Sequence, residues 1–330
     1  MFSLYDQNTC ADEDHRISLH TACSKGHHEV VKLLLEEGAN IDAMNENSRT
    51  PLHDACSNGN LEVVKLLLEK GANINAVDRY GSTPLNDACS NGDLEVVKLL
   101  LKNHANINAV DKYGSIPLHR ACYHGHLEVV ELLLEKGANI DAVNRDYHTP
   151  LHNACSKGHL EVIKLLLEEG ANIDAVNNDY HTPLNDACSN GHLEVVKLLL
   201  ENHANINAVR KYCPTPLNDA CSKGHLEVVE LLLEKGANIH VVAKDGSTPL
   251  NDACSKGHFK VVKLLLEKGA NINAVDRYGS TPLNDACSEG HLEVVKLLLE
   301  KGANIDAANK DGYTPLHYAC FYGHLEVVKL

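Results

Sequence analysis

Apolar residues recur along the chain as a short stripe followed by a longer, nearly continuous run. In one copy the short stripe consists of Leu85, Ala88 and Cys89, which share one face of a helix. The longer run, residues 94–101, reads Leu-Glu-Val-Val-Lys-Leu-Leu-Leu, and its apolar side chains cover more than one helical face. The pattern predicts a short helix and then a helix that is buried against its partner and both neighbouring copies.

Polar residues around these runs mark the helix ends. Thr83-Pro84 predicts a helix start, because the threonine hydroxyl can cap the helix and proline is tolerated at the first helical position. Gly92 ends the short helix, and His104 follows the long helix where most copies have a left-handed glycine. Residues 105–114 then lead back to the next proline. We expect them to form an extended two-arm loop with a turn at its tip.

The whole pattern repeats every 33 residues. Ser18 stands one period before the first of nine prolines, so the chain holds ten copies. A fixed period of this length is typical of a solenoid, which grows by adding units rather than by enlarging one core. The prolines are Pro51, Pro84, Pro117, Pro150, Pro183, Pro216, Pro249, Pro282 and Pro315.

The repeat resembles the ankyrin repeat. The resemblance rests on Thr50–His53 (Thr-Pro-Leu-His), Gly59, Leu61–Val64, Leu66–Leu68 and Gly71–Asn75, and it extends over residues 17–330. It implies an all-α ankyrin-repeat solenoid of helix-turn-helix units with projecting β-hairpin-like loops. It also implies that these loops, the fingers, and the first helix of each repeat line a concave face that binds partners.

Two segments follow from this organisation. Residues 1–16 are expected to act as an N-terminal cap, and residues 17–330 form the array of ten repeats, the last of them truncated. The chain stops at Leu330, midway through the second helix of repeat ten. We interpret this end as a fragment or incomplete gene product, or as a last repeat that frays.

Some copies depart from the common repeat. Glycine is replaced at four finger tips, which we expect to take another turn form because other residues resist a positive φ. Ile17 and Ile116 replace the capping threonine, so two helix starts lack a hydrogen bond worth about 0.5–2 kcal/mol. The tip replacements are Ser48, Tyr147, Tyr180 and Cys213.

Charge and cysteine usage narrow the class of protein. A net charge of −15 argues against a nucleic-acid binder, and no run approaches the ~20 apolar residues of a membrane span. Ten cysteines share one repeat slot, and equivalent positions of neighbouring repeats should be too far apart for disulfides. They are therefore expected to be buried free thiols, which indicates a reducing compartment. We therefore expect an intracellular, monomeric protein of the cytoplasm, with the nucleus as the alternative. The ten are Cys23, Cys56, Cys89, Cys122, Cys155, Cys188, Cys221, Cys254, Cys287 and Cys320.

The recurring Cys-x-x-x-His spacing, as in Cys155 and His159, invites a metal-site interpretation. Gly158 should end the helix between them, however, so the two side chains are expected to diverge. No CxxC, phosphate-binding glycine loop or catalytic arrangement stands out. Asn-Asp pairs such as Asn86-Asp87 place one acid per repeat on what we expect to be an exposed face. We predict no metal, no cofactor and no catalytic residue.

Tyrosines gather at the finger tips and on or near the first helices. Tyrosine is enriched at interfaces, although duplication of one tip would produce the same pattern. Repeat four also departs from the common repeat at its first helix, where Arg120 replaces the usual aspartate. It adds one positive charge to the row of aspartates that we expect between the fingers. The candidate partner-binding residues are Arg79, Tyr80, Lys112, Tyr113, Arg120, Tyr123, His124, Tyr147, Tyr180, Tyr212, Arg277, Tyr278, Tyr318 and Tyr322.

These observations favour a non-enzymatic scaffold that binds a partner protein on its concave face. Two alternatives remain: a metal or redox protein that uses the cysteines, or the binding portion of a larger enzyme, channel or ubiquitin-ligase adaptor whose effector lies beyond residue 330. The expected floor between the fingers consists of Asp54, Asp87, Asp186, Asp219, Asp252 and Asp285.

Overall fold

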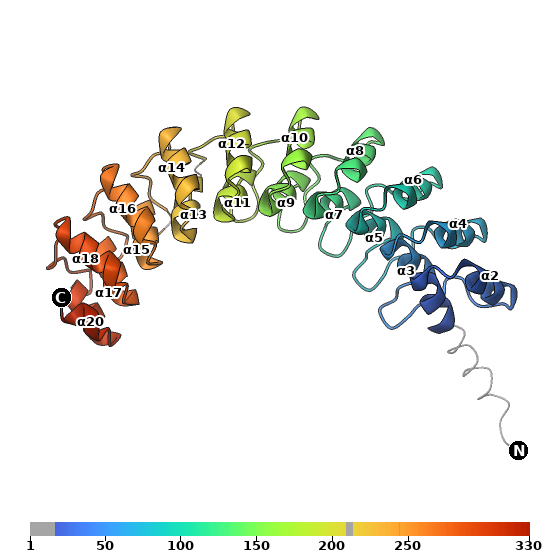
Figure 1. Cartoon of the computed structure of the whole chain (residues 1–330), viewed down its shortest axis with the longest axis horizontal. Helices are drawn as coiled ribbons and strands as arrows, with labels where there is room; N and C mark the ends of the chain where they lie inside the picture. Colours follow the sequence, from blue (N-terminus) through green and yellow to red (C-terminus); the bar gives the residue numbers. More distant parts are fainter. Residues whose placement is uncertain (1–16, 209–213, 244) are drawn as a thin grey trace, which may run out of the picture. The chain divides into compact units, whose positions relative to one another are not determined.

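The computed structural model describes residues 17–208, 214–243 and 245–330, and every regular element in these ranges is a helix (Figure 1). The first helix of repeat one covers residues 17–25. The other first helices are α3 (Pro51–Ser57), α5 (Pro84–Asn91), α7 (Pro117–His124), α9 (Pro150–Lys157), α11 (Pro183–Ser189), α13 (Pro216–Lys223), α15 (Pro249–Ser255), α17 (Pro282–Glu289) and α19 (Pro315–Phe321). The second helices are α2 (His28–Glu36), α4 (Leu61–Glu69), α6 (Leu94–Lys102), α8 (Leu127–Glu135), α10 (Leu160–Glu168), α12 (Leu193–Glu201), α14 (Leu226–Glu234), α16 (Phe259–Glu267), α18 (Leu292–Glu300) and α20 (Leu325–Val328).

The chain forms two compact units. The first comprises Met1–Ala154 and Glu161–Ala171, and the second comprises Cys155–Leu160 and Asn172–Leu330. The first helices α3, α5 and α7 of the first unit pack on one another in sequence order, as do α11, α13 and α15 of the second, and each of these six also packs on the second helix of its own repeat (Figure 1). This arrangement confirms the predicted solenoid of helix-turn-helix repeats. Each helix in the described ranges is too short or too polar to cross a bilayer.

Several of the predicted Thr-Pro helix starts are capped in both directions. At α5, the Thr83 hydroxyl accepts a hydrogen bond from the Asn86 backbone N–H at 3.3 Å, and the Asn86 side-chain oxygen accepts from the Thr83 N–H at 3.0 Å. In α7, Ile116 has no hydroxyl, but its N–H still donates to the ring nitrogen Nδ1 of His119 at 3.2 Å. Repeat four therefore loses half of the capping box and keeps the other half.

The expectation that finger tips without glycine take another turn form is wrong where the structure describes them. Ser48, Tyr147 and Tyr180 adopt φ values of 58°, 61° and 62°, in the same left-handed region as Gly81 at 71°. The same tip hydrogen bond closes each turn, for example from the Tyr147 N–H to a carbonyl three residues earlier at 3.0 Å. The turn's hydrogen bonds outweigh a left-handed penalty of about 1–2 kcal/mol. Cys213 lies outside the described residues.

The shared cysteine slot lies in the core. Nine of the ten thiols are free and buried, which confirms the predicted packing role, and burial raises the pKa of thiols such as Cys89 well above its usual value. Cys320, on the last first helix that the structure describes, is exposed. Cys89 packs with Leu85 and Ala88 as the sequence pattern predicts, and all three are fully buried.

Glycine at the end of a first helix makes room for the next repeat. Gly92 has a φ of 81°, and a Cβ atom there would lie 2.3 Å from Nδ1 of His126. That ring is held in place, because its Nε2 bonds the Ser90 carbonyl at 3.0 Å. An added methyl group at Gly92 must therefore displace a side chain that ties two repeats together.

We expect Gly92→Ala to lower the free energy of unfolding by about 2–3 kcal/mol, through backbone strain plus the lost His126 contact. Gly71→Ala is the matched control, because Gly71 has a φ of 87° but no heavy atom within 4 Å of the added Cβ. It should cost only the left-handed penalty of about 1 kcal/mol. Urea unfolding of both variants gives the comparison, and equal losses would contradict the steric role of His126.

Candidate partner-binding surface

Neighbouring fingers are joined at their tips by backbone hydrogen bonds. The Lys112 N–H donates to the Tyr80 carbonyl at 2.8 Å, and the Arg145 N–H donates to the Tyr113 carbonyl at 2.9 Å. In the second unit, the Arg277 N–H donates to the Asp245 carbonyl at 2.8 Å. The tip side chains therefore stand on a bonded row rather than on separate loops. We call the tips and the first helices together the finger face.

One cluster on the finger face brings four predicted residues together. Lys112 Nζ lies 3.9 Å from the centre of the Tyr80 ring, and the Arg79 guanidinium carbon lies 4.7 Å from it. Lys112 Nζ is also 5.0 Å from the ring centre of Tyr113, which is 51% exposed. Cations at these distances are attracted by the ring faces. The cluster offers both positive charge and aromatic surface to a ligand.

The same arrangement recurs in the second unit. The Arg277 guanidinium carbon lies 4.6 Å from the centre of the exposed Tyr278 ring, and the guanidinium also donates to the Tyr278 hydroxyl. Tyr147 and Tyr180 are exposed at their tips as predicted. Tyr212 lies outside the described residues.

The structure gives Arg120 a contact within its own repeat. Its guanidinium pairs with Asp111 at 2.5 Å, and the Asp111 side chain is fully buried. Beyond it on α7, Tyr123 is exposed and contacts His124 edge-on, with ring centres 5.1 Å apart. Arg120 therefore balances a buried charge, while Tyr123 and His124 form a separate exposed patch.

The two tyrosines of the last repeat differ in role. The Tyr318 hydroxyl accepts a hydrogen bond from the Asn309 side-chain amide at 2.8 Å, which ties α19 to its finger. Tyr322 is exposed at the end of α19, with its ring against Phe321 at a centre distance of 5.0 Å. Tyr318 therefore has a structural contact that Tyr322 lacks.

The aspartates of the first helices do not lie on an open surface, and that prediction is wrong. In the second unit they are partly buried between helices of neighbouring repeats. Asparagine amides of the preceding repeat donate hydrogen bonds to them there. These bonds run from Asn185 to Asp219 at 2.7 Å, from Asn218 to Asp252 at 2.7 Å and from Asn251 to Asp285 at 2.8 Å.

Burial disfavours the charged form of these carboxyl groups. It raises the pKa of Asp252 to about 6 and that of Asp285 to about 7, and it also raises the pKa of Asp219. Asp186 behaves in the same way, with its pKa raised to about 7 by burial and by the neighbouring Asp219. The second unit thus holds a row of carboxyl groups whose pKa values are raised by burial.

The asparagine-to-aspartate hydrogen bonds also explain why one buried side-chain nitrogen in the first unit lacks a hydrogen-bond partner among the described residues. The side-chain nitrogen of Asn86 is buried and has no hydrogen-bond partner among the described residues. By its repeat position it should reach the aspartate slot of repeat four, which holds Arg120 instead. The exchange of aspartate for arginine removes the acceptor.

Arg49, which the sequence interpretation passed over, organises the acidic residues of the first unit. Its Nε lies 3.1 Å from Oδ1 of Asp54, and its Nη2 lies 3.0 Å from Oδ2 of Asp87. A third carboxylate, Asp78, is 3.9 Å from Nη1, and the guanidinium also donates to the Ser57 hydroxyl. The signal was present in the sequence, because among the other copies only repeat one has arginine in this slot, at Arg16, and the rest have serine, histidine, proline or tyrosine.

Arg49 also affects ionisation. Burial opposes ionisation of Asp54, but hydrogen bonds from His20 and Arg49 outweigh it and hold the pKa of that carboxyl below its usual value. For Asp87 burial wins over the attraction of Arg49, and its pKa is raised. The guanidinium therefore allows two carboxyl groups to approach one another without allowing both to ionise easily.

The histidines of the Cys-x-x-x-His spacing bond backbone of the preceding repeat. Nε2 of His192 contacts the Ser156 carbonyl at 3.2 Å, and Nε2 of His225 contacts the Ser189 carbonyl at 3.1 Å. The cysteines four residues before them, Cys188 and Cys221, are buried in the core. Within the described residues, no three His, Cys, Asp or Glu side chains are arranged to hold a metal ion.

Comparison with known families is consistent with this geometry. A family model described as ankyrin repeats in three copies matches residues 2–78, 75–144, 138–210 and 209–276, and a related model for many copies matches residues 283–330. A comparison with curated proteins found no match.

Proposed function

The chain belongs to the ankyrin-repeat proteins, and from this premise we propose that it is a non-enzymatic scaffold that binds a partner protein on its finger face. Ankyrin repeats are in general modules for protein–protein interaction. The observation that carries the proposal is the cluster of Arg79, Tyr80, Lys112 and Tyr113 on a hydrogen-bonded row of tips. Arginine and tyrosine are the side chains that most often dominate binding energies.

The rigid support of this cluster favours binding. The tips of this cluster are fixed by backbone hydrogen bonds to their neighbours, so little conformational entropy is lost when a partner binds. The free, buried thiols support a reducing compartment, and we propose the cytoplasm, with the nucleus as the alternative. The acidic net charge favours a protein over a nucleic acid as the partner.

The test starts from a partner captured from the native source and purified. The double variant Tyr80→Ala/Tyr113→Ala should weaken its affinity about 10–30-fold, because two aromatic anchors are lost. Glu95→Ala/Lys98→Ala is the matched control, since it removes an exposed ion pair from the second helix α6 and should change affinity less than about twofold. An unchanged affinity of the tyrosine variant, or a larger loss in the control, would overturn the proposal.

A further inference from the structure

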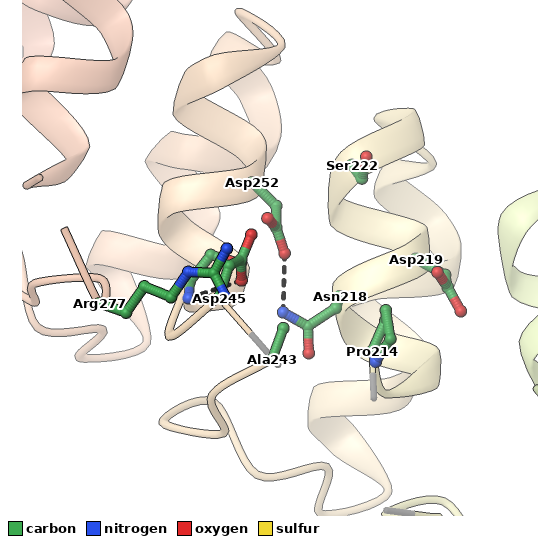
Figure 2. A pocket seen from close by; sticks show the side chains of 9 residues that line it. Pro214, Asn218, Asp219, Ser222, Ala243, Asp245, Asp252 and Arg277 are labelled. Atoms are coloured by element: carbon green, nitrogen blue, oxygen red, sulfur yellow. Dashed lines mark hydrogen bonds between the residues drawn. The ribbon is translucent and has the colours of Figure 1, made fainter. Parts of the chain in front are cut away.

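A pocket of about 440 Å³ opens on the finger face of the second unit, between α13 and α15 (Figure 2). Asn218, Asp219 and Ser222 line it from α13, and Asp252 lines it from α15. Pro214, just before α13, completes one wall. Figure 2 shows Asn218 reaching toward Asp252, to which it donates a hydrogen bond of 2.7 Å.

Two carboxylates of the pocket, those of Asp219 and Asp252, are not held in close ion pairs within the described ranges. Among the described residues, neither Asp219 nor Asp252 forms an ion pair within 4.0 Å. Arg277 also lines the pocket, but its guanidinium lies against its own Tyr278 ring, 4.6 Å from the ring centre. Asp245 is a third acid in the lining. Lys223 and His181 act on Asp219 only from beyond ion-pair distance. The close contacts of Asp219 and Asp252 are amide and hydroxyl groups. A cation between these two carboxylates would therefore stabilise both.

The first unit shows what occupies the equivalent place. Five repeats earlier, Asp54, Asp87 and Ser57 hold the positions of Asp219, Asp252 and Ser222. These three side chains, two on α3 and one on α5, bind one guanidinium, that of Arg49.

The residue at the Arg49 position in the second unit is Pro214, which carries no charge. The chain therefore contains both a filled copy of this guanidinium-binding arrangement and a copy whose internal arginine is missing. The fourth contact of Arg49, the more distant Asp78 at 3.9 Å, corresponds to Ala243, so the two nearer carboxylates and the serine are what the copies share.

We propose that the pocket formed by Asp219, Ser222 and Asp252 binds the guanidinium group of an arginine side chain on the partner protein. The proposal rests on the function proposed above, because it names a chemical feature of that partner. Arginine fits better than lysine, since Arg49 uses Nε and Nη2 to reach two separate carboxylates at 3.1 and 3.0 Å. A planar fork of donors can do this, whereas an ammonium group acts as one point charge.

The decisive variant supplies the missing arginine from the chain itself. In Pro214→Arg the new guanidinium should occupy the pocket as Arg49 occupies its own, and it should exclude an external one. Pro214→Ser is the matched control, because serine stands in the same slot at Ser82 and Ser247. It removes the proline without adding a charge.

The probe is acetyl-arginine methylamide at pH 7.5, followed by the carboxyl ¹³C signals of Asp219 and Asp252. We expect saturable shifts in the unchanged protein and in Pro214→Ser, and at least tenfold weaker binding in Pro214→Arg. The citrulline analogue, which has the same shape but no charge, should also bind at least tenfold more weakly to the unchanged protein. The comparison of the arginine and citrulline probes tests the proposal even if Pro214→Arg does not fold.

Two results would overturn the proposal: no saturable shift in the unchanged protein, or equal responses to the arginine and citrulline probes. Because the probe needs no partner protein, either result leaves the tyrosine experiment on the finger tips unaffected. Loss of partner binding in Tyr80→Ala/Tyr113→Ala would then still support the proposed scaffold function. The partner would in that case not place an arginine in this pocket.

Discussion

Replacement of Arg49 by methionine should lower the free energy of unfolding of the first unit by about 2–4 kcal/mol. The variant keeps most of the side chain's apolar bulk but removes the charge that lies between Asp54 and Asp87. Removing one partner of a buried ion pair typically costs about 3–5 kcal/mol, and the 21% exposure of Arg49 reduces this figure somewhat. Urea unfolding, monitored by hydrogen exchange in α3 and α5, measures the loss.

Lys98→Met is the matched control, because it removes an exposed cation that lies 2.7 Å from Glu95 on the same unit. Exposed pairs contribute about 0–1 kcal/mol, so this variant should be nearly neutral. Arg49→Lys should recover only part of the loss, since one ammonium group cannot bridge two carboxylates as the guanidinium fork does. If Arg49→Met proved as mild as Lys98→Met, the acidic residues would not need Arg49 for stability.

The second unit should lose stability as the pH rises from about 4 to 7. Its carboxyl groups ionise late in the folded state, with pKa values raised by burial to about 6 for Asp252 and about 7 for Asp186 and Asp285. In the unfolded chain the same groups ionise near 3.9. Over this range the unfolded state releases protons first, so deprotonation favours unfolding.

Two buried histidines of the first unit act in the opposite direction. Burial lowers the pKa of His119 to about 4 and also lowers that of His53, while an unfolded histidine titrates near 6.5. Their contribution to stability is complete above pH 6.5 and is lost as the pH falls toward 4. The lowered pKa of Asp54 also makes the folded state more stable at higher pH, and the raised pKa of Asp87 partly offsets this effect.

Hydrogen exchange at pH 5 and pH 7.5, corrected for the intrinsic exchange rates, can follow both units in one sample. Protection of α13, α15 and α17 should be greater at pH 5, and protection of α5 and α7 should be greater at pH 7.5. Asp252→Asn/Asp285→Asn should flatten the response of the second unit, because the amides keep the shape of the side chains but do not titrate. A response of the same sign in both units, or one unchanged in the variant, would contradict the assignment.

The sequence alone determined the fold and much of the packing. The 33-residue period, the Thr-Pro helix starts and the apolar spacing predicted the paired helices, and the shared slot of Cys89 predicted a buried thiol. These features could be predicted because they depend on local chain geometry and on which side chains leave water. Ten copies in phase made each local signal stronger.

Only the tertiary structure decided which polar side chains of neighbouring repeats meet. The sequence predicted Asp219 to be a surface acid next to Asn218, yet Asp219 accepts a hydrogen bond from Asn185, 34 residues earlier, and is partly buried. Arg49 was only an uncommon residue in its slot, and only the folded chain brings three carboxylates to its guanidinium. A periodic pattern reports which face of its own helix a residue occupies. The contacts that bury a charge come from the adjacent repeat, and they depend on how far one helix is shifted and turned against the next.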